Sequence, residues 1–278
     1  LVSLVFGPVT LFLGILSVRF LGQGMMSHIA VTAMARRYVS ERGRAVAIAG
    51  FGFPIAEGFL PPLITIGLTL FHWQTIWVAM GLAVALTLLP TIPFLLKRTA
   101  NQDGDFATRF AHDRTSRKHW TRAEMLRDRR FFMIAPLVMT MSAIFTGLIF
   151  HQKFIIGTAK NWDFLWWSFC FTSFAASQVA GSFLSGWLVD RVSARRITPY
   201  VLLPFGVSLA LLGWCENEIW AVFILSAMGL SAGATNPTFS SLWVELYGTK
   251  HLGAIRAAGT VLSVFASALG PVVVGWAL

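Results

Sequence analysis

The chain has 278 residues, of which 56% are hydrophobic and only 12% are charged, and its mean hydropathy is +0.68. A soluble globular domain carries roughly 25% charged residues, so this chain lacks the polar side chains needed to cover a water-exposed surface. The composition therefore excludes an ordinary soluble protein and indicates an integral membrane protein.

Membrane spans are predicted from length, because roughly 20 apolar residues in a helix cross a hydrocarbon core ~30 Å thick. Eight segments satisfy this criterion: 11–36, 44–70, 73–96, 131–151, 164–189, 197–214, 219–244 and 254–278. The sequence thus predicts an all-α, polytopic transmembrane helix bundle. The opening stretch ends at the turn signal Gly7-Pro8 and is predicted to be the tail of an earlier span. The last stretch has no polar tail, so we expect a sequence truncated at both ends, the middle part of a longer protein.

The net charge of +10 is distributed unevenly along the chain. Nineteen of the 22 Lys and Arg residues lie in or beside four alternate connections, at 36–44, 97–130, 190–196 and 245–254. The opposite connections hold only Lys153 and Lys160. Since basic residues concentrate in cytoplasmic loops, these four connections are predicted to be cytoplasmic, in the inner (plasma) membrane of a bacterium. The membrane topology then explains the net charge of +10, so the basic residues do not predict nucleic-acid binding.

The polar segment 97–130 divides the spans into two groups. Residues 1–96 are predicted to be part of an N-terminal transmembrane bundle, and residues 131–278 a C-terminal bundle that lacks its last helix. In the segment between them, Thr121 and Glu124 are spaced as a capping box, with Trp120 as the staple residue. We expect a short amphipathic helix on the inner membrane surface; a solvated linker is the alternative.

Residues that could carry catalysis or bind a metal are scattered along the chain. Cys170 and Cys215 have no partner at metal-ligand or redox spacing. Neither an H-E-x-x-H motif nor a Ser/His/Asp grouping is present. The sequence therefore predicts no enzymatic site, no metal site and no cofactor.

The two groups of spans are weakly similar to each other. Residues 22–50 and 229–259 both combine a span rich in small residues, a Tyr at its exit, a short basic connection and an Ala/Gly-rich helix start. Transporters are built from such internal repeats, with the substrate site at the repeat interface; chance similarity between two small-residue helices is the alternative. The small residues at 229–234 are predicted to allow close helix packing.

The stretch "GWLVDRVSARR", at 186–196, places an acid and three arginines between two apolar runs. Its residues Gly186, Asp190, Arg191, Arg195 and Arg196 resemble the G-x-x-x-D-R-x-G-x-R-R loop signature of the major facilitator superfamily. The stretch departs from that signature at Ser193, where the family prefers glycine. Two further stretches, "RFLGQG" at 19–24 and "ERGRA" at 41–45, resemble the family's fourth helix and the connection after it. The resemblance covers nearly the whole chain and implies helices four to eleven of a secondary transporter.

The loop signature is predicted to act as a latch between the two halves of the transporter. Asp190 is expected to face the positive N-terminus of the helix that opens at 43–45, an interaction worth roughly 0.3–1 kcal/mol. Arg191 or Arg195 is expected to pair with Glu245, which leaves its helix at the same level. Such contacts would favour one access state and break in the other. An ordinary cluster of cytoplasmic arginines is the alternative, but it does not explain the acid.

Glu57 lies in the stretch "GFGFPIAEGFLPPL" at 50–63. Drug/proton antiporters of the superfamily carry a glycine-rich pattern here, from which this stretch departs, so the resemblance is closer to the monocarboxylate and oxalate/formate-like branches. Arg19 and Glu57 are predicted to lie ~12 Å and ~20 Å from the outer surface, and to pair because isolated charges at such depth are costly. The pair would either fix helix packing or, with Glu57 protonated, free Arg19 to hold an anionic solute.

Four other polar residues at membrane depth are predicted to line the central cavity as substrate residues: His28, Gln178, Thr235 and Asn236. Interhelical hydrogen bonds are the alternative role for such residues. The predicted function is secondary active transport of a small organic anion such as a monocarboxylate, with the proton as candidate coupling ion. An exporter of amphipathic compounds or drugs, and a non-transporting sensor or scaffold, are the alternatives. The expected partners are the solute and the lipid bilayer, and the expected state is a monomer.

Overall fold

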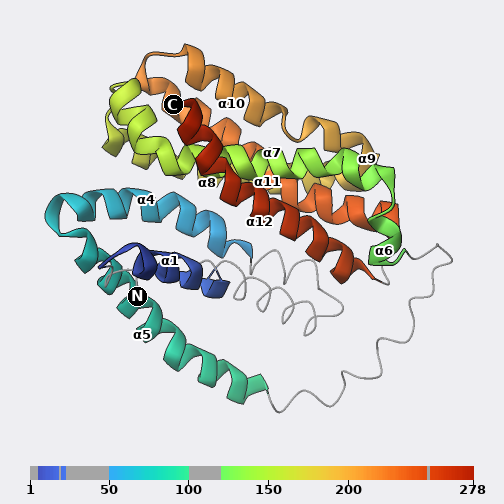
Figure 1. Cartoon of the computed structure of the whole chain (residues 1–278), viewed down its shortest axis with the longest axis horizontal. Helices are drawn as coiled ribbons and strands as arrows, with labels where there is room; N and C mark the ends of the chain where they lie inside the picture. Colours follow the sequence, from blue (N-terminus) through green and yellow to red (C-terminus); the bar gives the residue numbers. More distant parts are fainter. Residues whose placement is uncertain (1–5, 19, 23–49, 100–119, 249–250) are drawn as a thin grey trace. The chain divides into compact units, whose positions relative to one another are not determined.

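The computed structural model describes residues 6–18, 20–22, 50–99, 120–248 and 251–278. Within these residues the regular secondary structure is helical, without a strand (Figure 1). The all-α fold predicted from the sequence is therefore confirmed for the described part of the chain. Two compact units are present: one comprises residues 1–53 and 63–115, and the other comprises residues 54–62 and 116–278.

The first unit contains α1 (Pro8–Ser17), α5 (Trp73–Thr99) and both ends of α4 (Gly52–Leu70). α1 begins directly after Gly7, with a proline in its first turn, where the missing N–H has no helical partner to lose. Large apolar side chains along α4 and α5, such as Leu63, Leu86 and Leu89, are exposed. Exposure of this kind is expected of helices whose solvent is lipid, because lipid chains are as apolar as leucine.

The second unit holds the remaining helices and residues 54–62 of α4. In chain order these helices are α6 (Arg122–Met125), α7 (Arg129–Gln152), the π-helix η5 (Lys153–Ala159), α8 (Phe164–Val192), α9 (Ala194–Ile197), the 3₁₀-helix η6 (Thr198–Tyr200), α10 (Leu203–Trp214), the 3₁₀-helix η7 (Glu218–Trp220), α11 (Ala221–Tyr247) and α12 (Leu252–Ala277). α7 continues directly into η5. α11 packs along α8 and α12 packs along α7, so the unit is built from two pairs of long helices (Figure 1).

Six helical segments of the described chain are long and apolar enough to cross a membrane. They are Gly52–Leu70, Trp73–Pro93, Arg129–Ala159, Ala194–Trp214, Glu218–Tyr247 and Leu252–Ala277, and each coincides with a predicted span. α8 occupies the predicted span 164–189 but is not among the six. The predicted span 11–36 lies largely outside the described residues. The prediction of an integral membrane protein is confirmed.

Glycines allow α8 and α11 to touch along their backbones. A Cβ atom added at Gly229 would collide with the carbonyl oxygen of Phe174, and one added at Gly233 would collide with the carbonyl oxygen of Gln178. Both glycines are buried. Close helix packing through the small residues at 229–234, as predicted, is confirmed at these two positions.

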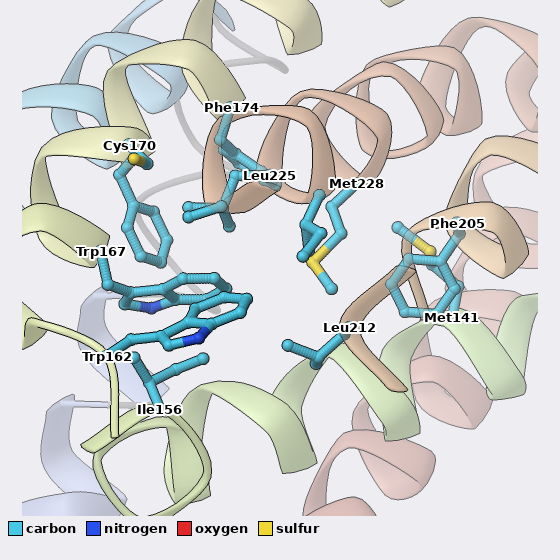
Figure 2. Close-up of a cluster of buried hydrophobic side chains, with 13 residues drawn as sticks. Met141, Ile156, Trp162, Trp167, Cys170, Phe174, Phe205, Leu212, Leu225 and Met228 are labelled. Atoms are coloured by element: carbon cyan, nitrogen blue, oxygen red, sulfur yellow. The ribbon is translucent and has the colours of Figure 1, made fainter. Parts of the chain in front are cut away.

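Aromatic and sulfur-containing side chains fill the core of the second unit. Figure 2 shows the indoles of Trp162 and Trp167 side by side, with their ring centroids 6.4 Å apart. Phe174 of α8 and Met228 of α11 continue this cluster between the two helices. The packing holds α8 and α11 in a fixed relation, and this fixes the position of the polar residues that they carry.

Candidate functional site

The Glu245 carboxylate caps the start of α9. Its Oε1 accepts a hydrogen bond from the backbone N–H of Ala194 at 2.8 Å, and its Oε2 accepts one from the backbone N–H of Arg195 at 3.3 Å. The Ser193 hydroxyl donates a third hydrogen bond, of 3.0 Å, to Oε2. A carboxylate suits this position because the first N–H groups of a helix have no partner within the helix.

The Arg195 guanidinium joins the same contact from the other direction. Its Nη2 donates a hydrogen bond of 2.9 Å to the backbone carbonyl oxygen of Glu245. This carbonyl is in the last turn of α11, where backbone oxygens lack helical partners. Of the two arginines predicted to pair with Glu245, Arg195 is the one in contact. The side chain of Glu245 thus binds the backbone at the start of α9, and the side chain of Arg195 binds the backbone at the end of α11.

Ser193 is in a backbone conformation that favours glycine. Its φ is 115° and its ψ is 141°, in the turn between α8 and α9. A non-glycine residue in such a region costs about 1–3 kcal/mol and persists only where its surroundings enforce it. The loop signature prefers glycine at this position, and the structure gives the physical reason for that preference. Here the serine retains the turn and adds a hydrogen bond to Glu245.

The remaining residues of the loop signature are spread over the end of α8. The Arg191 guanidinium lies over the Trp187 ring, 4.2 Å from its centroid, in a cation–π contact. Gly186 has no neighbour within 4 Å of an added Cβ atom, and Asp190 and Arg196 are exposed. The helix start at 43–45, predicted to face Asp190, lies outside the described residues.

The end of the polar segment 97–130 is attached to the same end of α11. The Trp120 backbone N–H donates a hydrogen bond of 3.1 Å to the carbonyl oxygen of Tyr247, and the two rings meet edge to face with centroids 5.6 Å apart. The Thr121–Glu124 capping box is present at the start of α6. Met125 is fully buried in a cluster with Tyr247 and Ile255. α6 is therefore held on the ends of α11 and α12.

Glu57 and Gln178 form a second polar contact, between α4 and α8 within the second unit. Their side chains lie within hydrogen-bonding reach of each other. Nearby, the Thr172 hydroxyl donates a hydrogen bond of 3.4 Å to the carbonyl oxygen of Gly58, and a Cβ atom added at Gly58 would lie 2.8 Å from the Ala175 Cβ atom. Within the described chain, Glu57 Oε2 and Gln178 Oε1 are buried and have no hydrogen-bond partner.

Asn236 belongs to α11, on the turn after Gly233, and is exposed. Gly233 in turn packs against the backbone of Gln178. Pro237 follows Asn236 inside the helix and cannot donate the usual backbone hydrogen bond. The Thr235 hydroxyl donates to the Ser231 carbonyl oxygen at 2.8 Å, within α11 itself.

Two of the predicted substrate residues, Arg19 and His28, lie outside the described residues, and with them the predicted pair of Arg19 and Glu57. The contact between Glu57 and Gln178 was not predicted, although both residues were singled out as polar groups at membrane depth. The roles of Ser193 and Trp187 were also missed. Over the part of the chain that the structure describes, no three His, Cys, Asp or Glu residues are grouped so that they could hold a metal ion.

Comparison with known protein families gives one match. The family model described as Major Facilitator Superfamily matches residues 1–271. No curated protein and no solved structure matches the chain. The matched range includes the Glu57–Gln178 contact and the loop at 186–196 with Glu245.

Proposed function

Because this chain belongs to the Major Facilitator Superfamily, whose members are membrane transporters, we propose that it moves a small organic solute by alternating access as a secondary active transporter. The solute class that we propose is an organic anion such as a monocarboxylate, with the proton as coupling ion. The anion part depends on Arg19, the cation predicted inside a span. The proton part depends on Glu57.

The observation that carries this proposal is the position of the Glu57 side chain. It belongs to a helix long and apolar enough to cross a membrane, and it lies within hydrogen-bonding reach of Gln178. An ionisable residue inside a span is expensive, so it is a functional-site candidate by default. A scaffold or sensor has no need of a carboxyl group at that depth.

The contacts around Glu245 fix the shape of the loop that carries the proposed latch. They tie the loop after α8 to the end of α11 through four hydrogen bonds that involve Ser193, Ala194 and Arg195. We propose that this loop and Glu245 lie on the cytoplasmic side and hold one access state. A shift between access states then requires that contacts of the loop with the other half break.

Reconstitution tests the proposed function. Purified protein in liposomes should accumulate a labelled monocarboxylate above empty liposomes when a pH gradient is imposed. Glu57→Gln protein should transport without responding to pH. Uptake of no carboxylate, together with movement of amphipathic dyes, would instead favour the exporter. Absence of any transport from well-folded protein would favour a sensor or scaffold.

A further inference from the structure

We propose that Glu57 and Gln178 form a cyclic acid–amide pair that holds one exchangeable proton between α4 and α8. The inference rests on the proposed function in assigning this proton to transport. It adds a specific role for Gln178, which is to receive the hydrogen bond that the proton makes possible. Gln178 is thus a positioning residue for the proton on Glu57.

Two buried oxygen atoms in this contact lack a donor. The two side chains lie within hydrogen-bonding reach of each other, yet within the described chain Glu57 Oε2 and Gln178 Oε1 have no partner. An ionised carboxylate only accepts hydrogen bonds, and so does an amide oxygen. Two acceptors therefore remain in the same contact with no hydrogen atom for either, and burying an unsatisfied polar atom is unfavourable.

A single proton on Glu57 satisfies both atoms. Protonated Oε2 becomes a donor, and Gln178 Oε1 accepts its hydrogen bond. The Gln178 amide N–H group donates to the other carboxyl oxygen, so acid and amide exchange two parallel hydrogen bonds. The proton comes from water when the O–H bond forms and returns to water when it breaks. In the neutral pair no charge is buried at membrane depth, whereas ionisation leaves a buried anion and removes the second hydrogen bond.

The surroundings of the pair leave Glu57 as the group that titrates. α4 has no other charged residue. In α8 the ionisable residues are Cys170, Asp190 and Arg191, each two or more helical turns from Gln178. α11 packs against the Gln178 backbone at Gly233, and its ionisable residues, Glu245 and Tyr247, lie three or more helical turns from that glycine. Beside the pair, α4 and α8 also meet where Gly58 approaches Ala175 and where the Thr172 hydroxyl donates to the Gly58 carbonyl oxygen. The predicted neighbour Arg19 lies outside the described residues.

Infrared spectroscopy of the full chain in lipid nanodiscs tests the pair without transport. We expect a protonated-carboxyl stretching band that disappears as the pH rises and is absent from Glu57→Gln protein. Gln178→Leu should shift this band, because the carboxyl loses both hydrogen bonds of the pair; Gln178→Met serves if the leucine variant is poorly produced. Thr172→Val is the matched control, since it changes a neighbouring contact only and should leave the band in place. A band unaffected by Glu57→Gln, or one that Gln178 variants do not shift, would overturn the inference.

A residue swap in liposomes tests the link with transport. Glu57→Gln combined with Gln178→Glu rebuilds the pair with the acid on α8. pH-dependent uptake that is lost in Glu57→Gln protein should return in the double variant. Uptake that stays independent of pH in the folded double variant would contradict the pair. An infrared band that behaves as expected, in wild-type protein that transports nothing, would overturn the proposed function and leave the pair standing.

Discussion

The Ser193 hydroxyl donates a hydrogen bond of 3.0 Å to the Glu245 carboxylate from a residue whose own φ is 115°. The loop signature prefers glycine here because glycine takes such a φ without strain. In this chain a serine takes its place, and the strain of the turn is offset by the contacts of the carboxylate. The turn between α8 and α9 therefore depends on Glu245 more than a glycine turn would.

Two substitutions at Ser193 separate strain from hydrogen bonding. Ser193→Ala keeps the unfavourable φ and loses the hydroxyl, so it should lower stability by about 1 kcal/mol. Ser193→Gly loses the same hydrogen bond but relieves the strain, so it should be close to neutral or stabilising. Thermal denaturation of the two purified variants in detergent measures the difference. Equal midpoints for the two would show that the positive φ carries no cost.

The stability of the turn between α8 and α9 should depend on the two carboxylate oxygens of Glu245. Glu245→Ala leaves the N–H of the buried Ala194 without a partner, which costs about 1–3 kcal/mol. Glu245→Gln keeps one acceptor oxygen and should lose less. Thermal denaturation and labelling of single cysteines at 190–196 measure both effects. Glu218→Gln is the matched control, since that carboxylate accepts from the Asp163 N–H at another helix start. If cysteine labelling at 190–196 rose as much in Glu218→Gln protein as in Glu245→Ala protein, Glu245 would have no specific role in holding this loop.

The sequence predicted the helices well and their side-chain contacts less well. Spans such as Gly52–Leu70 follow from hydropathy, because lipid selects for apolar residues along the whole helix. The contact of Glu57 with Gln178 depends on how α4 and α8 face each other, and hydropathy carries no such information. Glu245 was predicted to pair with an arginine side chain. Its backbone partners belong to α9, a helix of four residues that leaves no periodic pattern.

Asp190 tests the proposed latch directly. It is exposed near the end of its own helix, where a negative charge is unfavourable unless another group compensates for it. Asp190→Asn should therefore lower transport while the amount of protein in the membrane stays nearly constant. Uptake assays and quantification of the membrane fraction measure the two. Wild-type transport by the variant would remove Asp190 from the latch.

The proposed orientation predicts the side on which each loop lies. A reporter fused after Arg114 should be cytoplasmic and one fused after Lys160 should be outside, because nineteen of the 22 basic residues gather in or beside the first set of loops. Labelling of single cysteines in intact cells with an impermeant reagent gives an independent measurement. Access to residue 114 from outside would reverse the assignment of every span.

Gly233 and Gly186 form a matched pair for testing the contact between α8 and α11. A Cβ atom at Gly233 would collide with the carbonyl oxygen of Gln178, and a backbone atom cannot move aside as a flexible side chain can. Gly233→Ala should therefore destabilise the protein by about 1–3 kcal/mol, as overpacking does, and should displace Gln178 from Glu57.

Gly186 is the control position. It is also inside a helix, but a Cβ atom there meets nothing within 4 Å. Gly186→Ala should leave stability unchanged or raise it by about 0.5–1 kcal/mol, because alanine favours a helix interior over glycine. Thermal denaturation of both variants in detergent, with the protonated-carboxyl band as second measurement, decides the matter. If Gly233→Ala were as stable as Gly186→Ala and kept that band, α8 and α11 could not be in backbone contact at Gln178.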